Sequence, residues 1–471
     1  MKKRRKCLTI WQMVPKMRGI RVGKSAVIFG GWEMILKKGA LATMALILAC
    51  AVWAGDGIPM GSAIFYPSIE ANYTGTDNIY LQNNTMPYGN VSNYWWQIRP
   101  SVGFLFPFKE SYVRVDAGYQ YVDYGKNYTP GTHDTYTGDI VGVFKFGHGN
   151  SFTFSDNYIH GLQEVQKFDP GYEQYYNNTP FNSNAFKMAV DFAINKSNTL
   201  GVYAIYNDVS FTDVSPSTSV PFFSYQQVGG GLLWKYNYRP NADWLLDVSY
   251  LYNKPTSKVW DEGLLYNVNS KKYNAWMAFT GIEGDMGTML SGYAKVGWAT
   301  LNYDNAQSNF NGFVAKVGLG IKPSEFFRIN LDLNRIPYQS AYNVNNYYTA
   351  TGGQVALTQQ VTRHFFWTAG YFYQENAYPD FTSAYPLGFG GATSNEFIYS
   401  AGEKRNDKIS RAFAELGYHF TKQWSVKFNY QYEDRNSNIE YTDPTPGLYW
   451  GYHQPYSYTE NRYTLSAKFG W

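Results

Sequence analysis

Charged residues recur at alternate positions in many segments, and this spacing indicates what chemistry the chain can do. In Arg114-Val-Asp116 and in Arg328-Ile-Asn-Leu-Asp332, one or three residues separate the charged side chains. Such side chains fall on one face of a β-strand, because successive residues of a strand point to opposite faces. Cations and carboxylates on a shared face can form ion pairs across strands, or they can draw ions into a wet interior.

We expect these charged residues to line an aqueous lumen. The predicted lining residues are Arg99, Arg114, Asp116, Lys187, Asp191, Asp247, Lys295, Lys316, Arg328, Asp332, Arg411, Glu415, Lys427, Arg462 and Lys468. Basic residues outnumber acidic ones in this set, which leaves two interpretations open. Cross-strand ion pairs stiffen the wall, which is the favoured interpretation, or the lumen is a channel that weakly attracts anions.

Aromatic residues gather in two predicted loops, 376–407 and 434–456, and could bind sugars. The candidate stacking residues are Tyr378, Phe381, Tyr385, Tyr449 and Trp450. Exposed rings can stack on the faces of sugars. Rings can equally pack a long loop against itself or plug a channel mouth, and packing is the favoured interpretation because long loops need a core of their own.

Signatures of catalysis are lacking in the sequence. The six histidines are scattered, with no H-E-x-x-H frame, and no G-x-S-x-G elbow occurs. Gly229-Gly230-Gly231 lies inside a strand pattern and precedes no helix, which favours a bulge or a close backbone approach over a phosphate loop. We therefore expect no enzyme activity, no cofactor and no metal site.

The elements that position these side chains are amphipathic strands. In the last ten residues, Tyr463, Leu465, Ala467, Phe469 and Trp471 alternate with polar or small residues. A strand of this kind, with an aromatic residue at the chain terminus, is typical of bacterial outer-membrane barrels, whose outer face meets lipid. The alternation predicts a transmembrane β-barrel that closes with this segment.

The connections between the strands alternate in length. The short ones are predicted at residues 107–111, 147–150, 195–198, 237–243, 283–287, 322–325, 361–364 and 421–423. The long ones are predicted at 83–92, 125–134, 161–184, 208–221, 253–272, 302–309, 335–346, 376–407 and 434–456. This alternation predicts one all-β, antiparallel, up-and-down barrel of about 18 strands, with short turns in the periplasm and long loops outside.

Composition agrees with a barrel. Aromatic residues make up 19% of the chain, with 44 tyrosines, although the mean hydropathy is only −0.40. Aromatic girdles, a polar lumen and polar loops account for both values. A soluble β-sandwich or β-helix is the alternative, but a sandwich would have little use for Tyr and Trp at both ends of its strands.

The first 54 residues predict a leader. A short basic start at Met34 to Lys38, an apolar stretch, and small residues at Val52 and Ala54 indicate a signal peptide cleaved after Ala54. Met34 is the expected true start, and Cys50 forms only a weak lipidation motif. We therefore assign 1–54 to the leader and signal peptide and 55–471 to the barrel.

Removing the leader changes the charge of the protein. The leader holds 11 of the 40 basic residues and one of the 36 acidic ones, which leaves 29 basic against 35 acidic and a net charge of about −6. The basic character therefore belongs to the leader, and no nucleic-acid partner is expected. Both cysteines also lie in the leader, and a mature chain without Cys suits the oxidising cell envelope.

The first two strands carry a motif. It reads Pro67-Ser68, then Tyr73-Thr-Gly-Thr-Asp77-Asn78, then Pro100 in the next strand. This pattern resembles the putative β-barrel porin 2 family over about the first quarter of the mature chain, although the spacing from Tyr73 to Asp77 is one residue longer here. Members of that family often accompany exopolysaccharide systems, so the resemblance implies a polysaccharide-linked role.

These observations predict a channel in the outer membrane of a Gram-negative bacterium. The leading function is a conduit for polysaccharide export; the alternatives are a diffusion or uptake porin for small solutes, and a plugged structural or surface barrel. The expected partners are outer-membrane lipid and lipopolysaccharide, the barrel-assembly machinery through the C-terminal strand, and periplasmic polysaccharide-export components.

Overall fold

The computed structural model describes most of the predicted mature chain. The described residues are 57–79, 81, 91–125, 132–162, 180–211, 224–256, 271–305, 308–340, 345–381, 398–399, 403–439, 441–442, 452–453 and 457–470. They all belong to one compact unit, Gly55–Trp471. The predicted leader, with its cleavage site and both cysteines, and the terminal Trp471 lie outside the described residues. Nowhere in the described ranges does a helix have the length and apolarity needed to cross a membrane.

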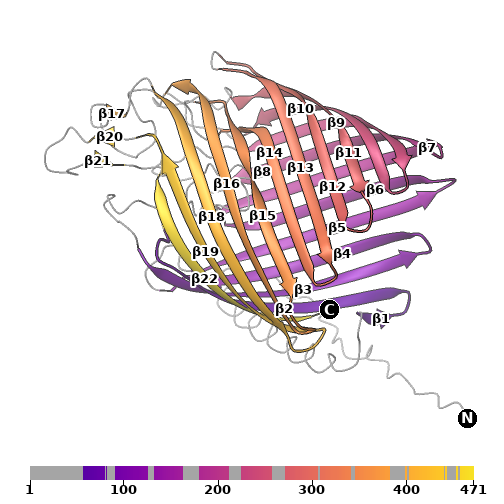
Figure 1. The fold of residues 1–471 in the computed structure, drawn as a ribbon, viewed down its shortest axis with the longest axis horizontal. Coiled ribbons are helices and arrows are strands. Elements are labelled where there is room, and N and C mark those ends of the chain that lie inside the picture. Colours follow the sequence, from indigo (N-terminus) through magenta and orange to yellow (C-terminus); the bar gives the residue numbers. More distant parts are fainter. Residues whose placement is uncertain are drawn as a thin grey trace, which may run out of the picture. The chain divides into compact units, whose positions relative to one another are not determined.

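Long antiparallel strands form a closed barrel of 18 strands (Figure 1). They are β2 (Ala63–Thr76), β3 (Asn93–Phe108), β4 (Ser111–Asp123), β5 (Thr132–Phe146), β6 (Asn150–Leu162), β7 (Pro180–Asn195), β8 (Asn198–Phe211), β9 (Tyr225–Arg239), β10 (Ala242–Pro255), β11 (Tyr273–Asp285), β12 (Leu290–Tyr303), β13 (Phe310–Ser324), β14 (Phe327–Gln339), β15 (Tyr347–Gln360), β16 (Phe365–Phe381), β18 (Lys404–His419), β19 (Trp424–Ser437) and β22 (Tyr458–Gly470). Each strand pairs with the next in the chain, so the predicted up-and-down barrel is confirmed.

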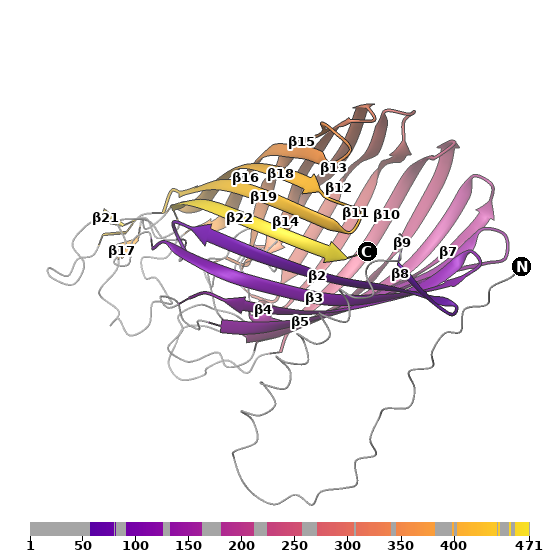
Figure 2. The ribbon, with the colours of Figure 1, turned by 90° about the horizontal axis from the view of Figure 1, so that it is seen from below.

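The first and last long strands meet and remove the open edges of the sheet (Figure 2). β22 pairs with β2 from Ser68 opposite Gly470 to Thr76 opposite Arg462. β1 (Ile58–Met60) folds back and pairs with residues 63–65, at the start of β2, where β22 has already ended. Closure leaves few unpaired backbone groups, which lipid could not satisfy.

The short connections fall where the sequence predicts them, but several strands extend beyond their predicted ends. The observed turns lie at 109–110, 147–149, 196–197, 240–241, 286–289, 325–326, 361–364 and 420–423. At the other end, β16 runs on to Phe381 and β14 to Gln339, inside segments that the sequence assigns to loops. The predicted loop boundaries were wrong at these two places. The backbone hydrogen bonds between strands continue beyond the point where apolar and polar side chains stop alternating in the sequence.

A small second sheet was not expected from the sequence. It consists of β17 (Ile398–Tyr399), β20 (Tyr441–Thr442) and β21 (Tyr452–His453). β17 pairs with β20, and β20 pairs with β21. Two long connections, β16 to β18 and β19 to β22, are therefore joined by backbone hydrogen bonds outside the barrel sheet.

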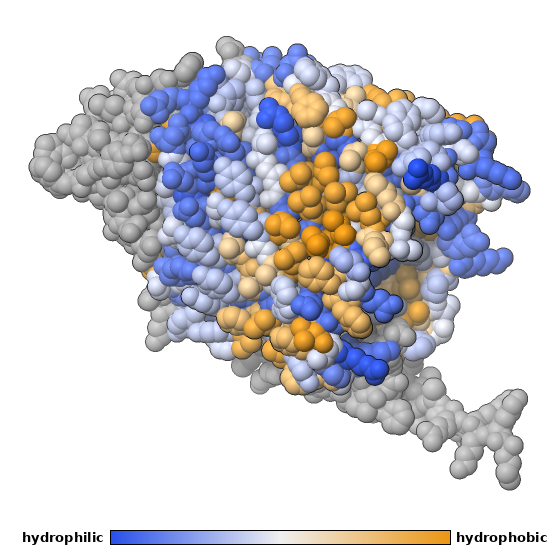
Figure 3. Space-filling model, in the orientation of Figure 1, coloured by the Kyte–Doolittle hydropathy of each residue, from blue (hydrophilic) through white to orange (hydrophobic). Residues whose placement is uncertain are grey.

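The outward face of the barrel is apolar and exposed. Trp96, Leu465, Val296 and Leu416 are 55%, 50%, 48% and 49% exposed, and Figure 3 shows apolar side chains gathered on one face of the molecule. On this face, Tyr and Trp residues lie near the long loops. Tyr73 and Trp96 are an example, with ring centroids 4.5 Å apart. A soluble protein would bury such residues, whereas lipid favours them on the outside of a barrel.

Candidate functional site

The predicted lining residues all occupy inward strand positions. Each of them alternates with the outward apolar series of its strand, as Arg462, Thr464 and Ser466 alternate with the exposed Tyr463 and Leu465. The closed barrel brings these positions, which are distributed along the whole chain, onto one inner surface. Their role in lining an open channel stays a prediction.

Exposure divides the inner surface into two halves. Inward charged residues nearer the short turns, such as Arg114, Lys145, Arg328 and Lys468, are exposed. Inward residues nearer the long loops are buried. This second group includes Thr76, Gln120, Asn253, Tyr348, Gln374, Asp407 and Arg435. Solvent therefore reaches the interior from the short-turn end, and the long-loop end is packed.

Ion pairs form at several places on the inner surface. On one wall, Glu283 of β11 binds Lys235 of β9 at 2.7 Å and Lys295 of β12 at 2.8 Å. On the other, Lys427 lies 3.1 Å from Glu415. Arg114 pairs with Asp116 at 2.7 Å. Arg99 instead donates to the amide oxygen of Gln120. These contacts agree with the wall-stiffening interpretation for part of the predicted set.

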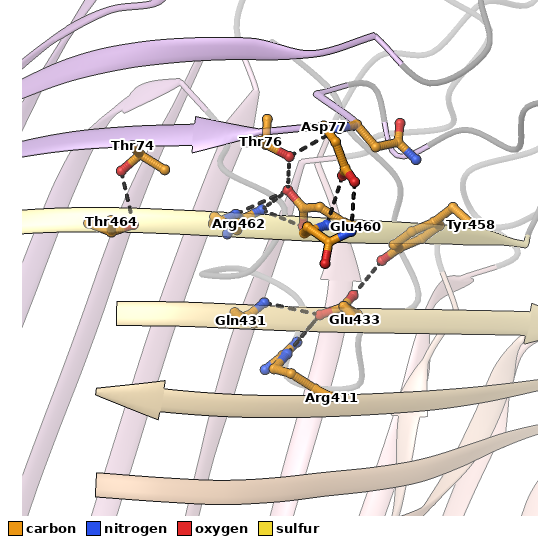
Figure 4. Close-up of polar contacts among 12 residues, drawn as sticks. Thr74, Thr76, Asp77, Arg411, Gln431, Glu433, Tyr458, Glu460, Arg462 and Thr464 are labelled. Carbon is orange, nitrogen blue, oxygen red and sulfur yellow. Dashed lines mark hydrogen bonds and ion pairs between the residues drawn. The ribbon is translucent and has the colours of Figure 1, made fainter. Parts of the chain in front are cut away.

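A buried charge network occupies the packed half where β18, β19 and β22 lie side by side. Asp407 is fully buried between Arg405 and Arg435, at 2.7 and 2.6 Å. Next to it, Glu433 binds Arg411 at 2.7 Å and accepts a 2.6 Å hydrogen bond from Tyr458, as Figure 4 shows. Carboxylates and guanidinium groups can share this dry interior because each compensates the other.

The same network continues across the seam of the barrel. Glu460 of β22 lies 2.9 Å from Arg462 and accepts a 2.7 Å hydrogen bond from Thr76 of β2 (Figure 4). Thr74 and Thr464 meet at 3.1 Å. Side chains thus reinforce the joint between the first and last strands.

The Asp77-Asn78 motif fastens that seam near the long-loop end of the barrel. The backbone and side-chain amides of Asn461 donate to the two carboxylate oxygens of Asp77, each at 2.7 Å. The side-chain amide of Asn78 donates to the carbonyl of Thr459 at 2.8 Å, and Asn78 is fully buried. The motif that carries the family resemblance therefore closes the barrel, and its local role is structural.

Residues at the bases of several long connections bind one another at the long-loop end of the barrel. Lys271 donates to the carbonyl of Asn345, and Asn305 and Asn346 exchange amide hydrogen bonds of 2.7 Å. Asp380 binds both the hydroxyl of Ser308 and, through its backbone amide, the Asn345 side chain. Because β11 and β15 are separated by three strands, the Lys271 contact joins residues from well-separated positions around the barrel.

The placement of Tyr378 in a loop was wrong, whereas its burial agrees with the favoured interpretation that these rings pack. Tyr378 lies in β16 and is 3% exposed; its ring centroid lies 5.4 Å from that of Tyr348, and Arg405 lies 4.6 Å above its ring. It faces the barrel interior because β16 continues past Asn376. Phe381 also belongs to β16. The other candidate stacking residues, Tyr385, Tyr449 and Trp450, lie outside the described residues.

Inward aromatic residues are the part of the site that the sequence prediction missed. Tyr203, Phe279 and Tyr293 occupy inward positions on β8, β11 and β12. Each of them is next to an outward residue in the sequence, namely Val202, Ala278 or Ala294. The period-two alternation of a strand therefore assigns all three aromatic residues to the inward face. The prediction overlooked them because it assigned aromatic residues to the lipid side.

The chain is similar to several solved structures at low sequence identity. The vanillate-bound OpdK of Pseudomonas aeruginosa is 11% identical, with a TM-score of 0.44, and the match covers 88% of this chain and 100% of that one. OpdQ from Pseudomonas aeruginosa is 11% identical at a TM-score of 0.42, over 86% and 99%. The siderophore receptor PirA from Acinetobacter baumannii is 8% identical at 0.41, over 86% and 80%.

Sequence comparison places the chain in a family. No curated protein matches the sequence. A family match, in contrast, spans residues 53–445 and so covers most of the barrel, from before β1 into the connection that follows β19. It extends well beyond the opening motif around Pro67 to Asn78. The closed barrel and this match together show that the chain belongs to the family described as "Putative beta-barrel porin 2", a family of outer-membrane β-barrels.

Proposed function

We propose that this outer-membrane barrel is a passive channel for small hydrophilic solutes. The observation that carries the proposal is the exposed, charged inner surface of the short-turn half, set against an apolar outer surface. Such a surface holds water in the interior, and charged rings along a wet path select among ions and polar solutes. The family assignment to porins supports the same function, and we propose no enzymatic role.

Two features favour small solutes over polymers. The packed long-loop half, with Asp407, Arg435 and Gln374 all buried, leaves less room at the outer end. The contacts of Lys271, Asn305 and Asp380 also join the described residues at the bases of several long connections at that end. A hydrated polymer needs a wider path than a monomer does.

Polysaccharide export is the second candidate function, and one specific observation supports it. Inward rings such as Trp95, Tyr66 and Tyr203 are able to stack on sugar faces inside the barrel, and the family resemblance implies the same role. This candidate further requires periplasmic export components as partners.

Reconstitution into planar bilayers tests the proposed function. We expect stable, ohmic conductance from the purified protein alone, and a reversal potential in a KCl gradient that reports a preference for chloride. A deletion strain separates the candidates, since impaired uptake of small solutes with unchanged surface polysaccharide supports the channel. Reduced polysaccharide export with unchanged synthesis would instead support the conduit. Neither conductance nor an export defect would indicate a plugged structural barrel.

A further inference from the structure

Three consecutive short turns are joined to one another by hydrogen bonds. They connect β13 to β14, β15 to β16 and β18 to β19 (Figure 1), at residues 325–326, 361–364 and 420–423. The carbonyl of Phe326 accepts a 2.8 Å hydrogen bond from the backbone amide of Gln360. The backbone amide of His419 donates to the carbonyl of His364 at 2.8 Å, and Nδ1 of His364 donates back to the carbonyl of His419 at 2.7 Å. We call these three turns the basic rim, because of the charges they carry.

Positive charge is concentrated on the basic rim. With histidine counted as neutral, the described residues within three positions of its turns include four basic ones and one acidic one: Lys322, Arg328, Arg363, Lys422 and Glu325. The same count over the other five short turns finds four basic and four acidic residues: Lys109, Lys145, Lys196, Arg239, Glu110, Asp243, Glu283 and Asp285. The basic rim therefore has an excess of three positive charges, and the other five turns have none.

The charges that follow on the adjoining strands do not offset this excess. Glu415 is already paired with Lys427. Glu70 of β2 lies directly opposite Lys468 of β22, so this acidic residue also has a basic neighbour. The two acids and two lysines balance one another, and the excess stays on the three turns.

Two cations lie at the tips of these turns and face solvent. Arg363 and Lys422 are exposed, and no ion pair joins either of them to a carboxylate within the described ranges. Lys322 and Arg328 instead belong to the inward series of β13 and β14. Arg363 and Lys422 are therefore the cations best placed to meet an anion outside the barrel.

Apolar side chains lie next to these cations on the outward face. Val361 and Phe420 are 51% and 59% exposed, and they continue the outward series of β15 and β18. The ring of Phe420 lies 4.9 Å from that of the outward Tyr418. Along each of these two strands, the surface passes from apolar residues to a cation at the turn. A phospholipid leaflet has the same order, from acyl chains to phosphate.

We propose that the basic rim binds an anionic phospholipid of the periplasmic leaflet of the outer membrane. Arg363 and Lys422 would bind the phosphate, while Val361 and Phe420 would pack against the acyl chains next to the headgroup. Short turns of outer-membrane barrels face the periplasm, and lipopolysaccharide belongs to the opposite leaflet.

A lipid fits this surface better than an acidic protein does. The apolar side chains beside the cations point outward, toward the bilayer, whereas a periplasmic protein would approach the tips of the turns. The site also lies outside the lumen, so it does not depend on what the channel conducts.

Native mass spectrometry of the purified full-length protein with added lipid tests the site. The probes are dioleoyl phosphatidylglycerol, which is anionic, and dioleoyl phosphatidylcholine, which has the same acyl chains and no net charge. We expect the protein to retain phosphatidylglycerol several-fold more tightly. Equal retention of the two lipids would overturn the site. Displacement of phosphatidylglycerol by an equal concentration of inorganic phosphate would show a bare anion site and overturn the lipid assignment.

A double substitution identifies the cations. Arg363→Gln combined with Lys422→Gln should lower the affinity for phosphatidylglycerol about three- to tenfold, the range for two exposed charge contacts. Retention of phosphatidylcholine should not change. The matched control is Lys196→Gln combined with Arg239→Gln, which removes the same two residue types from two other consecutive turns that also carry exposed apolar side chains. Phe420→Asn should weaken both lipids, because they share their acyl chains.

Both double variants should give the heat-modifiable folded form, since the substituted side chains are exposed in turns or at a strand end. An equal loss of phosphatidylglycerol in the two double variants would show that cations of any turn hold the lipid, and would overturn the site. Unchanged lipid retention in Arg363→Gln with Lys422→Gln, together with weaker binding of hexaglutamate, would replace the lipid by an acidic protein segment as the ligand.

Discussion

At the scale of residues, the barrel uses the same charged side chains in two environments. Asp407, Arg405 and Arg435 form a dry network in which every charge has a partner. Lys187 and Lys316 face solvent over aromatic rings. Burial explains why the first group is fully paired and the second is not, because a charge without a partner is tolerated only where water reaches it.

Asp407→Asn should destabilise the folded barrel by about 3–5 kcal/mol, because it leaves two buried guanidinium groups without their shared carboxylate. Urea-induced unfolding in lipid vesicles measures the change. The matched control is Glu415→Gln, whose partner Lys427 is 41% exposed. A control effect of less than about 1 kcal/mol is expected, as for exposed pairs. Equal losses of stability in the two variants would contradict the distinction between buried and exposed ion pairs.

Asp77→Ala should loosen the seam, because two amide donors of Asn461 lose their acceptor. The expected loss is about 1–3 kcal/mol, the range for an unsatisfied hydrogen-bonding group. It should appear as a lower temperature for the gel-mobility shift between folded and unfolded protein. Asp123→Ala is the control, since Asp123 accepts a hydrogen bond from Gly125 within its own connection. An unchanged transition in Asp77→Ala would refute the role of the motif in closure.

At the scale of elements, the alternation of turn and loop lengths predicts how the barrel is oriented. Short turns such as residues 325–326 and 361–364 lie at one end, and the long connections lie at the other. Outer-membrane barrels place short turns in the periplasm and long loops outside.

Epitope tags test this orientation. A tag within residues 383–396 or 444–450 should bind antibody on intact cells, because long loops face the medium. A tag at residues 325–326 should bind only after the outer membrane is permeabilised. Labelling of the second tag on intact cells, with the first inaccessible, would reverse the orientation.

Deletion of residues 469–471 should block assembly of the barrel. It removes the rung between Gly470 and Ser68, and the Phe469 ring that lies 4.8 Å from Trp424. An unpaired sheet edge in lipid is costly. The heat-modifiable folded form should be absent from outer membranes, whereas removal of three residues from 383–396 should leave it intact. Normal folded protein in the first deletion would exclude this role of the closing strand.

At the scale of the whole molecule, the predicted cleavage of residues 1–54 would change the net charge. This segment carries 11 of the 40 basic residues, and residues 55–471 are acidic overall. A mature barrel with a net charge of about −6 could still prefer anions, because selectivity depends on the charges that face the lumen.

N-terminal sequencing of protein from outer membranes should find a mature chain that begins near Gly55, because Val52 and Ala54 satisfy the small-residue rule of signal peptidase. Substitution of Ala54 by a bulky residue such as Phe should slow cleavage, while Ala51→Phe should have little effect. Recovery of the chain with residues 1–54 intact, or with a lipidated Cys50, would show that this assignment is wrong.

The sequence alone predicted a barrel of about 18 strands, the places of the short turns and the strand face of the charged side chains. These follow from the alternation of side chains and from turn residues, which are local properties. Only the closed barrel decided which side chains meet. Asp77 binds Asn461, 384 residues away, and Tyr378 became an interior residue when β16 extended beyond its apolar pattern. The register between strands sets these contacts, and register depends on pairing around the whole ring, which no single strand encodes.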